Sequence, residues 1–227
     1  MAVLVITIDG PAASGKSTVA RLVAARLGAS FLDTGAMYRA VTLAVMRAGV
    51  DMNNERELLD VLEKHSFEFA AERDKMVVSI DGADVTEQIR ESAVTANARY
   101  IASSVKVREK LVQMQRDFAA KAEKVLTEGR DQGTVAFTDA DVKFYLTADS
   151  AERARRRYAE LRAKGINESI EQIRAAIEER DESDQGRQVG PLKAAGDAIV
   201  IDTTGLTVNE VVDEIICRVE EKCLGKS

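Results

Sequence analysis

The sequence contains few of the residues that mark several classes of protein. Its 227 residues include two cysteines, two prolines, one histidine and no tryptophan. Two cysteines are too few for a disulfide framework, and the one histidine, His65, has no evident acid–base partner. The longest apolar run, residues 3–8, is too short to cross a membrane. No basic segment precedes that run, so we expect no secretory signal and a globular protein of the cytoplasm.

Charged residues are numerous but unevenly placed. The chain has 32 basic and 38 acidic residues and a formal net charge of −6, which is unlike a dedicated nucleic-acid-binding protein. Basic residues nevertheless gather in two stretches, residues 99–116 and 153–164. Two positive clusters in an acidic chain suggest small, highly charged anions as ligands, and solvated helix faces are the alternative.

Short apolar runs alternate with helical patterns along the chain. The β-branched run at residues 3–8 precedes a helical pattern that ends at Gly28. Further strands are predicted at 31–33, 125–127, 142–146 and 198–202, and a further helix at 35–47. A closing helix follows Thr207, which forms a predicted capping box with Glu210. The alternation predicts an α/β domain with three layers around a parallel sheet.

Two segments depart from this alternation. Residues 66–90 have the pattern of short strands joined by polar turns, which predicts a small antiparallel sheet. Residues 151–187 are highly charged and have few large apolar side chains, which favours a mobile helical flap over core. The length corresponds to roughly one and a half domains and fits one core with an insertion.

The residues after the first strand match a phosphate-binding loop. Gly10-Pro11-Ala12-Ala13-Ser14-Gly15-Lys16-Ser17 fits the pattern G-x-x-x-x-G-K-[ST] and lies between an apolar strand and a helix. The N–H groups of such a loop and the helix N-terminus together bind phosphate. Lys16 is expected to reach the β- and γ-phosphates, and the Ser17 hydroxyl to ligate Mg²⁺. The sequence therefore predicts nucleotide binding here, with Thr18 next to the loop.

Three further motifs follow in an order that matches a known family. They are Leu32-Asp33-Thr34-Gly35-Ala36-Met37-Tyr38-Arg39, Glu128-Gly129-Arg130-Asp131-Gln132-Gly133-Thr134 and Arg180-Asp181-Glu182-Ser183-Asp184-Gln185-Gly186-Arg187. Together with the phosphate-binding loop they resemble the bacterial cytidylate kinases, over about residues 3–220. That family transfers the γ-phosphoryl group of ATP to CMP or dCMP, so the resemblance implies this activity, with Mg²⁺ as cofactor.

The resemblance also implies roles for individual residues. It places Arg153 with the phosphate-binding loop in the ATP site. The implied catalytic residues are Lys16, Arg130, Asp131, Arg157 and Arg180, and the implied CMP-binding residues are Asp33, Thr34, Arg39, Arg108, Arg130, Asp184 and Arg187. Phosphoryl transfer needs positioning and positive charge more than covalent help, which fits this set.

The implied architecture is a single P-loop kinase domain in three parts. They are a core (1–35, 106–150 and 188–227), a monophosphate-binding region (36–105, containing the antiparallel insert 66–90) and a lid (151–187). The expected partners are ATP and CMP or dCMP, with no nucleic acid and no membrane, and we expect a monomer.

Several alternatives remain open from the residues alone. Asp33 could cap the helix that follows it instead of contacting ligand, and Asp131 could pair with an arginine instead of assisting Mg²⁺ or the acceptor. Arg99 stands where the resembled family carries a nucleoside-contacting serine, so the choice of nucleoside is open. A kinase for another monophosphate is one alternative activity, and a P-loop nucleotide switch is another.

Overall fold

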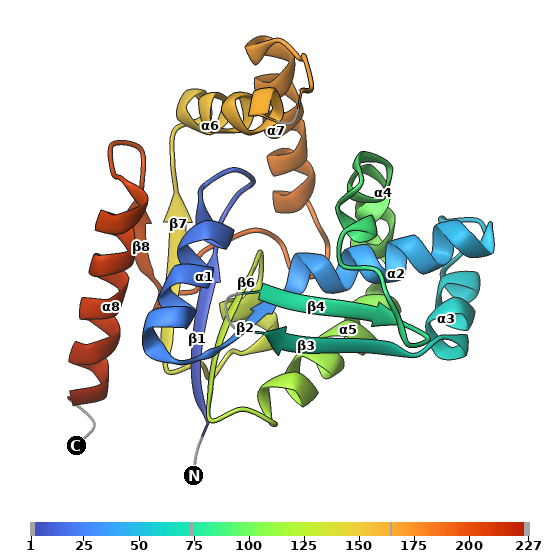
Figure 1. Ribbon diagram of the computed structural model, residues 1–227, viewed down its shortest axis with the longest axis horizontal. Helices are drawn as coiled ribbons and strands as arrows, with labels where there is room; N and C mark the ends of the chain where they lie inside the picture. The colour runs from blue at the N-terminus through green and yellow to red at the C-terminus, as the bar shows by residue number, and fades with distance from the viewer. Residues whose placement is uncertain (1–2, 73–74, 164, 225–227) are drawn as a thin grey trace. The chain divides into compact units, whose positions relative to one another are not determined.

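The computed structural model describes residues 3–72, 75–163 and 165–224. The chain forms two compact units, one from Met1–Leu4 and Ala24–Thr127 and the other from Val5–Val23 and Glu128–Ser227. The strands of the main sheet follow the order β2-β6-β1-β7-β8, and a second sheet has the order β3-β4-β5 (Figure 1). These two sheets and their flanking helices confirm the predicted α/β class with a small antiparallel insert.

The second unit is built on parallel strands. β1 (Leu4–Asp9) pairs with β7 (Val142–Thr147), and β7 pairs with β8 (Ile199–Asp202). Both faces of β1 are covered because Ile6, Thr7 and Ile8 are all fully buried. A continuous apolar run is what a strand covered on both faces requires, so the predicted strands here are confirmed.

Helices α1 (Lys16–Leu27) and α8 (Val208–Leu224) also belong to this unit, α1 up to Val23. α8 has the predicted capping box, because the Thr207 N–H donates to Glu210 at 2.8 Å and the Glu210 N–H donates to the Thr207 hydroxyl at 3.3 Å. Its buried stripe consists of Val211, Val212, Ile215 and Val219. Cys217 lies on the exposed side of the same helix.

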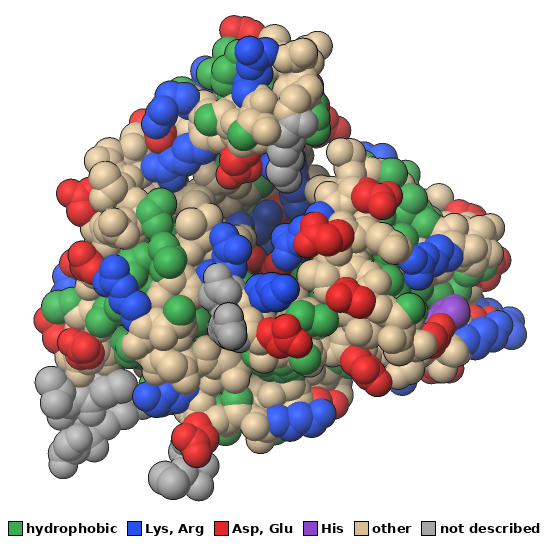
Figure 2. Space-filling view, in the orientation of Figure 1, with side chains coloured by type: hydrophobic (Ala, Val, Ile, Leu, Met, Phe, Trp, Pro, Cys, Tyr) green, Lys and Arg blue, Asp and Glu red, His purple; other side chains and the backbone are tan. Residues whose placement is uncertain are grey.

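The charged segment forms two helices with a hydrophobic core of their own. α6 (Ser150–Ala163) and α7 (Ile170–Gln185) pack against each other at the top of Figure 1. Four of their apolar side chains, Ala154, Leu161, Ile173 and Ile177, are buried together. Outside this core, acidic and basic side chains are interspersed (Figure 2). The segment is helical, as expected, and these buried residues give the helix pair a small core of its own, while its mobility stays a prediction.

The first unit contains the antiparallel sheet. β3 (Phe67–Glu72), β4 (Lys75–Ile80) and β5 (Ala83–Asp84) form it, with Phe67 opposite Ile80. β2 (Ser30–Asp33) and β6 (Lys124–Gly129, to Thr127 in this unit) are strands of the main sheet. The helices are α2 (Thr34–Ala48), α3 (Glu55–Lys64), α4 (Ser92–Ser103) and α5 (Val105–Ala119). Within the described ranges, no helix is long and apolar enough to span a membrane.

Candidate active site

The loop between β1 and α1 has the backbone that phosphate binding requires. Gly10 has φ +154°, and a Cβ atom there would lie 2.1 Å from the carbonyl oxygen of Leu146, so only glycine fits. α1 begins at Lys16, directly after the loop. The Ser14 hydroxyl is 1% exposed and has no hydrogen-bond partner among the described residues. A buried donor at a helix N-terminus fits an anion.

Lys16 is buried among positive charges. Its Nζ donates to the carbonyl of Pro11 at 3.1 Å and lies 3.9 Å from Oε2 of Glu128. Burial, followed by the charges of Arg130 and Arg180, lowers the pKa of the Lys16 ammonium to about 7, although Glu128 acts in the opposite direction. A polyphosphate beside Lys16 would restore the ordinary pKa, because an opposite charge favours the protonated form.

Glu128 is a site residue that the sequence analysis did not assign. It lies near the end of β6, is 5% exposed, and its Oε1 accepts a 2.8 Å hydrogen bond from the Ser17 hydroxyl. The signal was present, since an acidic residue directly after an apolar strand lies where ligands of α/β sheets bind. A hydroxyl and a carboxylate suit Mg²⁺, which prefers oxygen ligands. No group of three His, Cys, Asp or Glu residues suited to a metal occurs among the described residues.

Asp184 forms ion pairs with two arginines of the predicted site, Arg130 and Arg187. Its Oδ2 accepts a 2.8 Å hydrogen bond from Nε of Arg130, and its Oδ1 accepts from Nη2 of Arg187. Burial acts to raise the pKa of the Asp184 carboxyl, but the two arginines outweigh it and hold that pKa below its usual range. The structure thus brings three predicted site residues together in one partly buried ion-pair group.

Two arginines of α6 reach the phosphate-binding loop. Arg153 donates to the carbonyl of Ala12 at 3.2 Å and forms a buried ion pair with Asp181 of α7. Arg156 donates to the hydroxyl of Thr203 at 3.0 Å and to the carbonyl of Ser14 at 3.4 Å. Arg156 was not among the predicted residues, because sequence alone does not show which of several consecutive arginines faces the loop.

Four further predicted residues belong to this unit. Arg157 forms a 3.0 Å ion pair with Glu160 and is 41% exposed. Asp131 is buried and begins a π-helical turn, Gln132–Ala136. Arg180 is exposed, although its charge acts on Lys16. Thr18 is exposed in the first turn of α1. Their roles stay predictions.

In the first unit, Asp33 caps α2 and pairs with Arg39. Its Oδ1 accepts a 2.8 Å hydrogen bond from the backbone of Ala36, and its Oδ2 lies 3.3 Å from Nη2 of Arg39 and 3.8 Å from Nη2 of Arg90. Thr34, the first residue of α2, is buried. Asp33 therefore caps α2, and its contact with the ligand stays a prediction.

The remaining predicted residue of the first unit, Arg108, is 3% exposed. It donates to the carbonyl of Ala102 at 3.5 Å, and its guanidinium lies over the ring of Tyr38 at 5.6 Å. Arg99 instead is exposed and lies over the neighbouring Tyr100 ring at 5.0 Å. The sequence showed no acid–base partner for His65, but in the structure its Nδ1 lies 2.6 Å from Oδ2 of Asp81.

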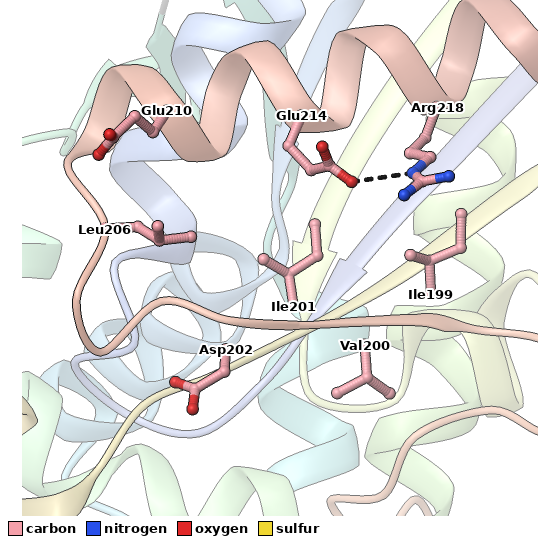
Figure 3. Close-up of a pocket in the computed structure, with 8 residues that line it drawn as sticks. All are labelled: Ile199, Val200, Ile201, Asp202, Leu206, Glu210, Glu214 and Arg218. Atoms are coloured by element: carbon pink, nitrogen blue, oxygen red, sulfur yellow. Dashed lines mark hydrogen bonds and ion pairs between the residues drawn. The ribbon is translucent and has the colours of Figure 1, made fainter.

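A separate cavity of about 460 Å³ lies between β8 and α8 (Figure 3). It is lined by Ile199, Val200, Ile201, Asp202, Leu206, Glu210, Glu214 and Arg218. Glu214 pairs with Arg218 at 2.8 Å, Glu210 bonds to Thr207, and Asp202 bonds to Thr204. None of the predicted site residues lines this cavity.

Arginines surround the phosphate-binding loop, and comparison with known proteins identifies the family. The family model described as cytidylate kinase matches residues 6–221. The chain belongs to the cytidylate kinase family. A cytidylate kinase from Stutzerimonas stutzeri (strain A1501) is 47% identical over 224 residues, with 97% of each chain covered. One from Anoxybacillus flavithermus (strain DSM 21510 / WK1) is 45% identical over 220 residues, again with 97% of each covered.

The fold is similar to a crystal structure of TT1252 from Thermus thermophilus, with a TM-score of 0.50 at 18% identity. The alignment covers 96% of this chain and 98% of the other. Membership of the family answers the question of activity that the motifs left open. The protein is a phosphotransferase that moves the γ-phosphoryl group of ATP to CMP or dCMP.

Proposed function

We propose that Lys16, Arg130 and Arg180 stabilise the negative charge of the phosphoryl group during its transfer. The observation that supports this role is the lowered pKa of Lys16, to which Arg130 and Arg180 contribute after burial. Three cations held close enough to perturb one another attract a trianionic group strongly, because a low-dielectric site screens little. Asp131 and Arg157 are proposed to assist them.

ATP binds, in this proposal, to the loop Gly10–Ser17 with Thr18, and Arg153 holds the loop from α6. Arg153 supports this role through its 3.2 Å hydrogen bond to the carbonyl of Ala12. Mg²⁺ would be held by the Ser17 hydroxyl with Glu128 beside it. When bound, the ion neutralises phosphate charge. The 2.8 Å contact between Ser17 and Glu128 supports the pair.

We assign the binding of the acceptor CMP to two groups of residues. In the first unit they are Asp33, Thr34, Arg39 and Arg108, and in the second they are Arg130, Asp184 and Arg187. Arginines suit this role because a planar guanidinium binds phosphate oxygens in pairs. The Asp184 carboxylate is an acceptor that could receive a hydrogen bond from the cytosine amine or a sugar hydroxyl.

We further propose the division into core (1–35, 106–150, 188–227), monophosphate-binding region (36–105) and lid (151–187), and a monomer located in the cytoplasm. Light scattering after size-exclusion chromatography tests the monomer. A dimer would contradict it and would draw attention to the groove of Figure 3, where Val200 is 59% exposed.

The decisive experiment measures ADP formation from ATP and Mg²⁺ with CMP, dCMP, UMP, AMP or no acceptor. We expect CMP and dCMP to stimulate turnover, which also measures the preference that Arg99 leaves open. The Lys16→Ala variant should lose activity by about 100- to 1,000-fold, whereas Lys121→Ala, at an exposed position, should not. Retained activity in Lys16→Ala would contradict the proposed role of the loop.

A further inference from the structure

Asp9 is a buried carboxylate to which neither the motifs nor the proposed chemistry gives a role. It is the last residue of β1, immediately before the phosphate-binding loop, and is 4% exposed. Its Oδ1 accepts a 2.9 Å hydrogen bond from the backbone N–H of Gln132, and its Oδ2 accepts a 2.8 Å hydrogen bond from that of Gly133. Both oxygens of the carboxylate therefore hold the same turn.

That turn is also packed tightly against the strands. A Cβ atom on Gly133 would lie 3.1 Å from the Thr7 hydroxyl and 3.2 Å from Cδ of Lys143. Thr7 and Asp9 lie on the same side of β1, because side chains alternate along a strand. The turn is thus held by hydrogen bonds at Asp9 and by close contact at Thr7, and has little freedom to move toward β1.

Arg130 and Asp131 immediately precede this turn, so its position determines theirs. Arg130 follows Glu128 by two residues, and the Glu128 carboxylate accepts a 2.8 Å hydrogen bond from the Ser17 hydroxyl and lies 3.9 Å from Nζ of Lys16. Before phosphate binds, Arg130 and Lys16 repel each other. The Arg130 side chain is held by Asp184 at 2.8 Å, whereas its backbone would shift if nothing held the turn that follows it. Asp9 opposes this movement through backbone hydrogen bonds, without using the side chain of Arg130.

We propose that Asp9 is a positioning residue: it fixes the turn at Gln132 and Gly133 and thereby holds Arg130 beside the phosphate-binding loop before substrates arrive. This inference rests on the proposed role of Arg130 in phosphoryl transfer. A preorganised charge is worth more in catalysis than one that must be ordered during the reaction.

The pKa of Asp9 indicates whether this side chain stabilises the fold or serves to position Arg130. Burial, with Asp131 adding to it, raises the pKa of Asp9 from 3.8 to about 6, although the hydrogen bonds from Gly133 and Gln132 and the charge of Lys16 act against the rise. Between these values the folded protein binds more protons than the unfolded chain, so stability falls as pH rises through them. At pH 7 the ionised Asp9 side chain therefore contributes less to stability than its protonated form would. In a neutral variant the removal of the buried charge offsets the loss of one hydrogen bond, so Tm should change little.

The test is Asp9→Asn, which keeps the size of the side chain but turns one acceptor oxygen into an NH2 group facing an N–H donor. We expect kcat to fall about 10- to 100-fold, as displacement of a catalytic group does, with Tm within about 3 °C of the wild type. Asp141→Asn is the matched control, since Asp141 accepts a 2.9 Å hydrogen bond from the backbone of Val5 at the other end of β1. Its kcat should stay within about twofold of the wild type, as expected of a site remote from the chemistry.

A double-mutant cycle with Arg130→Ala identifies the route of the effect. If Asp9 acts through Arg130, adding Asp9→Asn to Arg130→Ala should change kcat by less than about twofold. The inference would be overturned if Asp9→Asn lowered kcat in the Arg130→Ala background as much as it does in the wild type. It would also be overturned if Asp9→Asn had a normal kcat, or if its loss of activity were matched by a fall in Tm. A normal kcat in Arg130→Ala alone would instead contradict the proposed role of Arg130.

Discussion

The carboxylate of Asp184 accepts a 2.8 Å hydrogen bond from Nε of Arg130. The two residues are 54 positions apart and join helix α7 to the segment that follows β6. Asp184 is 2% exposed, and a carboxylate so buried needs positive partners. Arg130 satisfies one oxygen and Arg187 the other, so the charge of Asp184 remains compensated if one arginine is lost.

Arg187→Ala should impair the use of CMP far more than that of ATP. Arg130 still pairs with Asp184 in this variant, so the fold is retained, and the charged contact to the acceptor is lost. A hydrogen bond to a charged group contributes about 1.5–3 kcal/mol, which predicts a fall in kcat/KM for CMP of about 10- to 100-fold. Steady-state kinetics with each substrate varied in turn measures it.

Arg174→Ala is the control for this variant. Arg174 lies on α7, which ends two residues before Arg187, and forms a surface ion pair with Glu178 at 2.9 Å, so both kinetic constants should match the wild type. An equal loss for ATP and CMP in Arg187→Ala would contradict a role specific to the acceptor.

Binding of ATP with Mg²⁺ should be accompanied by proton uptake at pH 8. The pKa of Lys16 is lowered to about 7, mainly by burial and the charge of Arg130, so this lysine is mostly neutral at pH 8 before ATP binds. Phosphates beside it raise the pKa toward its ordinary value, and most of one proton should be taken up. Calorimetry in buffers with different ionisation enthalpies measures the number.

The same measurement at pH 6 should give almost no uptake by Lys16, because that lysine is already protonated below its pKa. Lys16→Met should abolish the uptake at pH 8. Uptake that is unchanged in this variant would show that another group titrates.

The strands and the phosphate-binding loop could be predicted because their signals are local. The β-branched run before Gly10 and the pattern through Ser17 need only neighbouring residues, and the structure confirms that strand, loop and helix. The capping box of Thr207 and Glu210 is local for the same reason.

Contacts between distant segments were harder to predict. Glu128 belongs to the site because it meets Ser17, a residue 111 positions away. Arg156 faces the loop and Arg157 does not, a difference of one helical position that depends on how α6 packs. Such contacts follow from tertiary structure, and the sequence pattern alone does not show which of several consecutive arginines contacts the loop.

Glu128→Gln should weaken the dependence on Mg²⁺ without removing ATP binding. The glutamine carbonyl can still accept the hydrogen bond from Ser17, but the negative charge near the ion is lost. Substitution of a residue that orients a metal ligand typically lowers metal affinity 10- to 100-fold. Half-maximal activity should therefore need about tenfold more Mg²⁺. Glu123→Gln, an exposed position just before β6, should leave the Mg²⁺ titration unchanged, and an unchanged curve in Glu128→Gln would contradict the proposed site.

Variants of Asp33 separate its cap from its charge. Asp33→Ala removes the acceptor for the N–H of Ala36 and should lower the free energy of unfolding by about 1 kcal/mol. Asp33→Asn keeps the cap but loses the charge that pairs with Arg39, so it should unfold like the wild type in urea while KM for CMP rises about fivefold or more, the loss of a partly buried charged contact. Asn54→Ala, which removes the cap of α3, should lower stability and leave KM unchanged. A wild-type KM in Asp33→Asn would mean that Asp33 serves the helix alone.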